Sequence, residues 1–144
     1  MSIISAFGDA LVADADISAA VGTRIRHGYA EEDMATPFIV FARSATEKVN
    51  HLERGSGREF VQLDVSIYDL SSTTALSISD DIREAFDNLF TLDLGGTGQL
   101  AVCHLQDEYT TVIPRTSFGH EKFFYRILQR WRIFTSESVV QPAP

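Results

Sequence analysis

The strongest constraint on the fold is a strict alternation of apolar and polar side chains between residues 60 and 68. The polar positions are Gln62, Asp64 and Ser66, and the residues between them are apolar. Because successive side chains of a strand point to opposite faces of a sheet, this period of two predicts a strand with one buried face and one solvated or shared face. The buried set is Val61, Leu63, Val65 and Ile67.

The segment after this strand has the clearest helical pattern in the chain. Apolar residues recur at intervals of three and four from Ile78 to Leu89, and several hydroxyl side chains at 71–73 can cap the start. This pattern predicts a helix over 72–90 that covers the sheet. Residues 3–13 predict another amphipathic helix, and Asp16 is expected to cap a short helix that ends at Gly22.

The remaining β-rich segments predict four more strands. Turn residues separate them, among which Gly55 and Gly57 are expected to mark a turn before the alternating strand. The predicted order is α-α-β-β-β-α-β-β, which is an α+β fold with one mostly antiparallel sheet and helices packed on one face. We expect a single domain over residues 1–135 and a flexible tail over 136–144. The four strands are predicted at 24–29, 37–47, 100–112 and 122–134.

Charge and cysteine content exclude several classes of protein. The chain of 144 residues has 20 acidic and 12 basic residues and a formal net charge of -8, which argues against a protein that coats duplex DNA by neutralising phosphates. Cys103 is the single cysteine, so no intrachain disulfide can form and a reducing cytoplasm is the expected folding compartment. No apolar run approaches the roughly 20 residues that span a membrane, so no membrane partner is expected.

The familiar catalytic patterns fail on order or geometry. The Gly95–Gly98 segment follows a helix and precedes a strand, whereas phosphate-binding loops run from strand to helix. Cys103 and His104 are neighbours on a predicted strand and therefore point to opposite faces, which favours a buried Cys103 over a nucleophile and base pair. The four histidines lack the spacing of zinc ligands. We therefore expect no catalytic residue, cofactor or metal, and a small hydrolase or nucleotide-binding enzyme remains the distant alternative.

A basic stripe lies on the last predicted strand. Its members have even numbers and therefore share one face: Lys122, Arg126, Arg130 and Arg132. One interpretation is an exposed strand face that pairs with Asp and Glu on the neighbouring strand. The others are a subunit interface against the acidic remainder of the molecule, or a contact with nucleic acid. The sequence leaves these alternatives open.

The chain resembles the tail-completion, or tail-terminator, proteins of long-tailed bacteriophages and phage-like particles. The resemblance extends over residues 3–134, and the order and spacing of several segments carry it. These segments are Leu11-Val12-Ala13-Asp14-Ala15-Asp16, Val21-Gly22-Thr23-Arg24-Ile25, Thr36-Pro37-Phe38-Ile39-Val40-Phe41, Val61-Gln62-Leu63-Asp64-Val65-Ser66-Ile67-Tyr68 with the helix after it, and the closing strand with Trp131. After Arg24-Ile25 this chain has His27-Gly28-Tyr29 where relatives often have a proline.

The resemblance implies a structural virion protein, assembled in the host cytoplasm and located at the head-proximal end of the tail. It implies a homo-oligomeric ring, typically a hexamer, that contacts the tail tube protein and the head-tail connector proteins while genome DNA passes through its lumen. On this reading Arg126, Arg130, Arg132 and Lys122 are expected at the subunit interface or lumen, and the loop Glu31-Glu32-Asp33 at neighbouring rings. The alternative is another head-tail connector or minor tail component.

Overall fold

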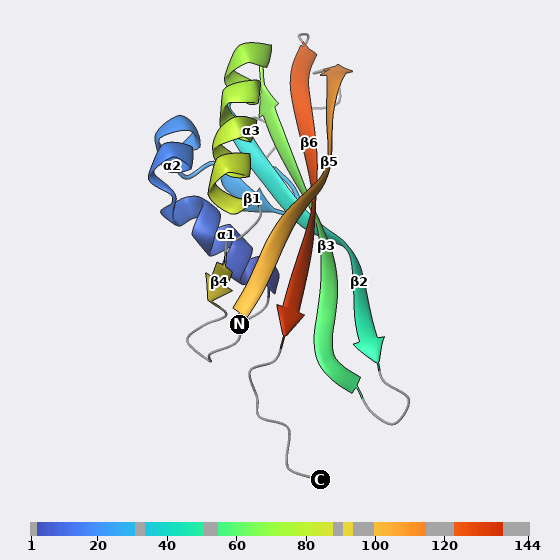
Figure 1. Ribbon diagram of the computed structural model, residues 1–144. Coiled ribbons are helices and arrows are strands. Elements are labelled where there is room, and N and C mark those ends of the chain that lie inside the picture. The colour runs from blue at the N-terminus through green and yellow to red at the C-terminus, as the bar shows by residue number, and fades with distance from the viewer. Residues whose placement is uncertain are drawn as a thin grey trace.

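The computed structural model describes residues 3–30, 34–50, 55–87, 91–93, 100–114 and 123–136. Three helices and six strands follow one another along these residues (Figure 1). The helices all lie on one side of the twisted sheet. In chain order the elements are α1 (Ile3–Ala13), α2 (Ala15–Val21), β1 (Ile25–His27), β2 (Phe38–Asn50), β3 (Gly55–Asp69), α3 (Ser72–Phe86), β4 (Thr91–Asp93), β5 (Leu100–Pro114) and β6 (Phe123–Ser136).

The strands form a single mixed sheet in the order β1-β2-β3-β6-β5-β4. Only the pairing of β1 with β2 is parallel among the strand pairs in the described residues, and the others are antiparallel. The predicted α+β class and element order are confirmed. The strand β4 is an addition, because three residues are too few to show a period of two in the sequence.

The hydrophobic core lies between the helices and one face of the sheet. The alternation in β3 works as predicted, since its odd-numbered apolar residues are all buried. Aromatic rings join the layers: Phe7 of α1 lies 4.8 Å from Phe86 of α3 and 6.1 Å from Trp131 of β6, centroid to centroid. Trp131 and Phe86 are 6.4 Å apart. These three rings hold two helices on the middle of the sheet.

The cap of α2 differs from the prediction. Asp14, not Asp16, is the N-cap, and its carboxylate accepts hydrogen bonds from the backbone N–H groups of Asp16 and Ile17. The reason is that α1 ends at Ala13, so the chain needs only Asp14 in an extended conformation before the next helix starts. Asp16 lies in the first turn, where its negative charge interacts favourably with the positive end of the helix dipole. Gly22 ends α2 with a positive φ of 60°, as predicted.

The boundaries of several other elements are also corrected. Gly55 and Gly57 lie inside β3, where Gly55 pairs with Asn50, and do not form the predicted turn. The predicted helix over 72–90 starts at Ser72, with Ser71 as its N-cap, and ends at Phe86. Its early end has a tertiary cause, because the Asp87 carboxylate accepts a hydrogen bond of 2.9 Å from the backbone N–H of Leu105 on β5.

Some predicted features lie outside the described residues. These are the Gly95–Gly98 segment and residues 137–144 of the predicted tail. The division into a domain over 1–135 and a flexible tail over 136–144 therefore stays a prediction, with Ser136 as the last residue of β6. Among the helices that the structure describes, none has the length and apolar character that crossing a bilayer requires.

Candidate interface on the uncovered face of the sheet

The side chains of β6 divide between a covered and an uncovered face of the sheet. The odd-numbered residues Ile127, Gln129, Trp131 and Ile133 are buried on the covered face, under the helices. The even-numbered residues Arg126, Leu128, Arg130 and Arg132 lie on the other face, partly or fully exposed. No helix within the described ranges covers this second face (Figure 1). The three arginines of the predicted stripe therefore share this face, which no described helix covers, although Phe38 and Phe124 at one end of it are buried.

Two of the arginines are held in place by β3. Arg126 donates from Nε and Nη2 to the Ser66 hydroxyl oxygen, over distances of 3.2 and 3.1 Å. Its guanidinium carbon lies 5.9 Å from the centroid of the Tyr68 ring, within the range of a cation–π contact. Arg130 Nε lies 3.4 Å from Asp64 Oδ1, its register partner on β3. Both guanidinium groups thus keep a fixed direction on the surface.

The Arg130–Asp64 pair confirms that part of the stripe is balanced by acidic residues on a neighbouring strand. Both side chains are about one-third exposed, at 34% and 27%. An ion pair in this setting contributes at most about 1 kcal/mol, because water screens it. Arg132 is exposed and lies 5.7 Å from the centroid of Phe134. Arg130 is thus balanced by Asp64, whereas Arg132 lies beside an aromatic ring.

An aromatic cluster stiffens one end of the same face. Phe38 of β2 stacks on Tyr68 of β3 with centroids 4.8 Å apart, and Phe124 of β6 meets both rings edge-on at 5.9 and 6.2 Å. Phe38 and Phe124 are buried, whereas Tyr68 is partly exposed. Such a cluster gives an interface a rigid surface that loses little entropy on binding.

We define the basic sheet face as Arg126, Arg130 and Arg132 together with Tyr68, Leu128 and Tyr109. Tyr109 of β5 is the register partner of Leu128 and is 47% exposed. The sequence pattern places the three arginines and Leu128 on this face, because they alternate on the predicted last strand. Tyr68 and Tyr109 join the face only through the strand register. Lys122 and the loop residues Glu31, Glu32 and Asp33 lie outside the described residues, so their predicted roles stay predictions.

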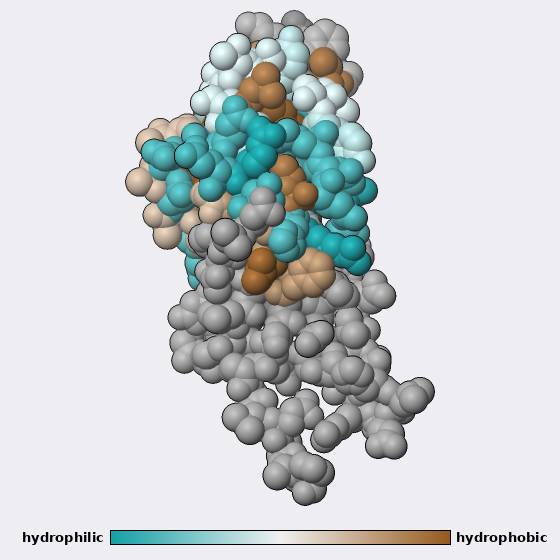
Figure 2. All heavy atoms as spheres, in the orientation of Figure 1, coloured by the Kyte–Doolittle hydropathy of each residue, from teal (hydrophilic) through white to brown (hydrophobic). Residues whose placement is uncertain are grey.

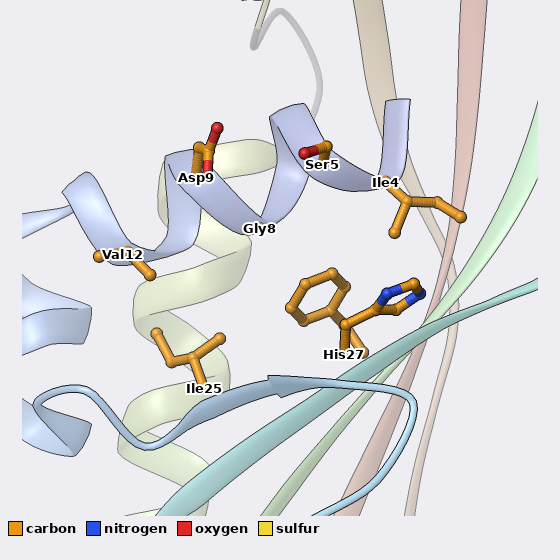
Figure 3. Close-up of a pocket in the computed structure, with 8 residues that line it drawn as sticks. Ile4, Ser5, Gly8, Asp9, Val12, Ile25 and His27 are labelled. Atoms are coloured by element: carbon orange, nitrogen blue, oxygen red, sulfur yellow. The ribbon is translucent and has the colours of Figure 1, made fainter. Parts of the chain in front are cut away.

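A groove lies between α1 and strands β1 and β2, and no sequence pattern indicated it. It has a volume of about 440 Å³, and its lining residues come from α1, β1 and β2 (Figure 3). The side chains of Ser5 and Asp9 lie along α1 in this view and do not converge on the His27 ring. His27 instead stacks on Phe41, 5.2 Å away. The lining residues are Ile4, Ser5, Gly8, Asp9, Val12, Ile25, His27 and Phe41.

Cys103 and His104, considered above as a nucleophile and base, lie on opposite faces of the sheet. Cys103 is buried, and burial raises the pKa of its thiol to about 12, which keeps it protonated. His104 is exposed on the opposite face, where it contacts the Phe134 ring, so the predicted separation of the two is confirmed. Within the described ranges no three His, Cys, Asp or Glu side chains come together as metal ligands would.

The fold and this face define an α+β protein with helices on one side of its sheet and arginine and aromatic side chains on the other. Comparison with known proteins identifies the family. Residues 6–120 match the family model described as "Tail completion protein gp17", and the chain belongs to this family. The expected resemblance is thereby confirmed, as is the expectation of a structural protein rather than an enzyme. Membership makes the protein a component of a virion tail.

The fold also has a counterpart among solved structures. A chain of the "Virion of native gene transfer agent (GTA) particle" superposes with a TM-score of 0.71 at 14% sequence identity. The match covers 94% of this chain and 96% of that chain. At this identity the likeness establishes a shared fold over nearly the whole length. No curated protein matches the sequence significantly.

Proposed function

We propose that the protein forms a ring, with six subunits, that caps the head-proximal end of the tail tube. The ring ends polymerisation of the tube protein and offers the surface to which the head-tail connector proteins bind. The observation that carries this proposal is the open basic sheet face in a member of a tail completion family. A half-exposed face of arginine and aromatic residues is typical of a surface that a partner subunit covers.

The charge of the chain is consistent with a conduit for DNA. A net charge of -8 disfavours tight binding of a polyanion, so the genome would pass through the lumen without sequence-specific contacts. Arginines that engage subunits, and not phosphates, fit such a role. Glu31, Glu32 and Asp33 would then lie in a loop that contacts a neighbouring ring.

The direct test is tail assembly with and without this protein, followed by electron microscopy of the products. A terminator predicts tubes of abnormal and variable length in its absence, with no heads attached, and a ring at the tube end when the protein is restored. Tubes of normal length that fail only to join heads would assign the protein to a connector or another minor tail component. Normal, joined particles in its absence would refute both roles.

A further inference from the structure

The two sides of the molecule differ in charge. The side formed by α2 and α3, which pack beside each other, carries mainly carboxylates. In Figure 2 hydrophilic side chains lie over the lower part of α3 and, beside more apolar residues, over part of α2. We define the acidic helix surface as Asp14, the N-cap of α2, and Asp16 of α2, together with Asp80, Asp81 and Glu84 of α3. The opposite side of the sheet bears the basic sheet face, on which Asp64 and Asp107 are the register partners of Arg130.

The carboxylates of the acidic helix surface crowd one another. Partial burial raises the pKa of Asp81, and the negative charges of Asp16 and Glu84 add to the effect, followed by Asp14 and Asp80. Arg83 offsets part of this charge, since it pairs with Asp80 and lies 3.6 Å from Glu108. A cation brought to this surface by another molecule would relieve the remaining repulsion.

The basic sheet face has the properties that such a partner needs. Arg126 and Arg130 are already oriented by Ser66, Tyr68 and Asp64, so they would lose little side-chain entropy on docking. Leu128 and Tyr109 add apolar area beside them. Guanidinium groups pair well with carboxylates through two parallel hydrogen bonds.

We propose that the basic sheet face of one subunit docks on the acidic helix surface of a second copy of this chain. The proposal rests on the proposed ring and names the contact that builds it. The two surfaces lie on opposite sides of one sheet. Each subunit can therefore bind one neighbour through its basic sheet face and the other neighbour through its acidic helix surface, so the contact is head-to-tail. Contacts of this kind close into a ring when the rotation between neighbours divides a full turn. Like charges oppose the alternative in which two basic faces meet.

Charge reversal on each surface tests this contact. The first variant combines Arg130→Glu with Arg132→Glu, and the second combines Asp81→Lys with Glu84→Lys. Either variant alone would place like charges across every contact, so ring formation should weaken by about tenfold or more. Joining all four substitutions in one chain restores opposite charges across each contact, and rings should return. Far-UV circular dichroism checks that each variant folds.

Mixing the two single-surface variants gives a sharper result. In a one-to-one mixture, the reversed sheet face of the first variant meets the reversed helix surface of the second. The unchanged sheet face of the second variant meets the unchanged helix surface of the first. Opposite charges then face each other at every contact, so an alternating ring with an even number of subunits should form. Single reversals at exposed sites outside both surfaces, Arg43→Glu and Asp9→Lys, serve as controls and should leave rings intact. Ring formation is measured by native mass and by electron microscopy of tube ends.

The outcomes separate this inference from the proposed function. If the unmodified protein forms no ring at tube ends, the ring itself is refuted. If it does, and the arginine variant also forms rings, or the four-substitution chain does not recover them, the proposed contact is wrong while the ring stands. If the Lys variant alone assembles normally, the basic faces contact something other than the helices of a neighbour, which also overturns the proposal.

Discussion

Gly8 lies in the middle of α1, directly against the ring of Phe41 on β2. A Cβ atom added at this position would come within 2.5 Å of Phe41 Cζ. Phe41 is buried and stacks on His27, so the ring has little freedom to retreat. The glycine therefore lets the helix approach the sheet closely, at the expense of helix propensity. Nothing in the local sequence indicates this requirement, since Phe41 is distant along the chain.

The substitution Gly8→Ala should destabilise the protein by about 1–2 kcal/mol. The clash with Phe41 costs about 1–3 kcal/mol as overpacking, and the helix propensity of alanine returns up to about 1 kcal/mol. Urea unfolding measures the net effect. In a Phe41→Leu background the clash is removed, so Gly8→Ala should there be neutral or stabilising. Equal effects in both backgrounds would show that the ring does not limit residue 8.

At the scale of elements, a buried glutamine connects β6 to both α3 and β5. Gln129 Nε2 donates to the Ser79 carbonyl oxygen and to Glu108 Oε1, both at 2.9 Å. Its Oε1 accepts a hydrogen bond of 3.2 Å from Trp131 Nε1. The side chain is fully buried, so its own polar groups depend on these bonds in place of water. The helix is therefore positioned on the sheet by polar contacts as well as by aromatic packing.

Replacing Gln129 with Leu should lower the free energy of unfolding by about 2–4 kcal/mol. The main cause is that the indole N–H of Trp131 is left buried without its acceptor, and Glu108 loses a donor. Urea unfolding followed by the fluorescence of Trp131, the only tryptophan, reports both stability and the indole environment. The matched control is Gln106→Leu on β5, which is exposed and should change stability by less than about 0.5 kcal/mol. Similar effects of the two substitutions would contradict this account.

At the scale of the whole molecule, the acidic helix surface and the three arginines of the basic sheet face lie on opposite sides of the sheet. Such an arrangement favours contacts between different surfaces of identical subunits, and salt should weaken these contacts by screening. The acidic helix surface is slightly unfavourable in the free subunit because its carboxylates repel. In the proposed ring the same carboxylates become favourable partners. A single substitution can therefore affect folding and assembly in opposite directions.

The substitution Asp81→Asn should show this opposition. Because the pKa of Asp81 is raised in the folded state, the ionised carboxyl disfavours folding above that pKa. The penalty fades as pH falls from that pKa to the ordinary value of 3.8 and is absent below it. At neutral pH the variant should therefore gain stability, by less than about 1 kcal/mol because solvent screens the group. At pH 3 the gain should shrink toward zero. Urea unfolding at the two pH values measures it.

The same variant should form rings less readily than the unmodified protein, because an acidic partner of the basic sheet face is lost. Native mass measurements over a range of protein concentrations give this comparison. The exposed carboxylate substitution Asp9→Asn on α1 is the control and should leave ring formation unchanged. Stability and ring formation that rise together in Asp81→Asn would argue against a role for this surface in assembly.

The sequence by itself determined the class of fold, the faces of the main strands and the family. The class of fold and the faces depend on local periodicity, since the alternation at 61–67 and the apolar spacing of α3 indicate which side is buried. The resemblance to the family rests on the order and spacing of several segments along the chain. The same alternation placed Arg126, Arg130 and Arg132 on one face. Ends of elements were less predictable, because Asp87 stops α3 through a bond to β5 and Gly55 enters β3 by pairing with Asn50.

Only the tertiary structure decided what surrounds the arginines and what lies across the sheet from them. Tyr68 and Tyr109 join the basic sheet face through strand register, and the acidic helix surface arises because α2 packs beside α3. These contacts join residues that are far apart along the chain, and a local sequence pattern does not indicate which distant residues will meet. The physical reason is that periodicity fixes the direction of a side chain, whereas packing of the elements fixes its neighbours.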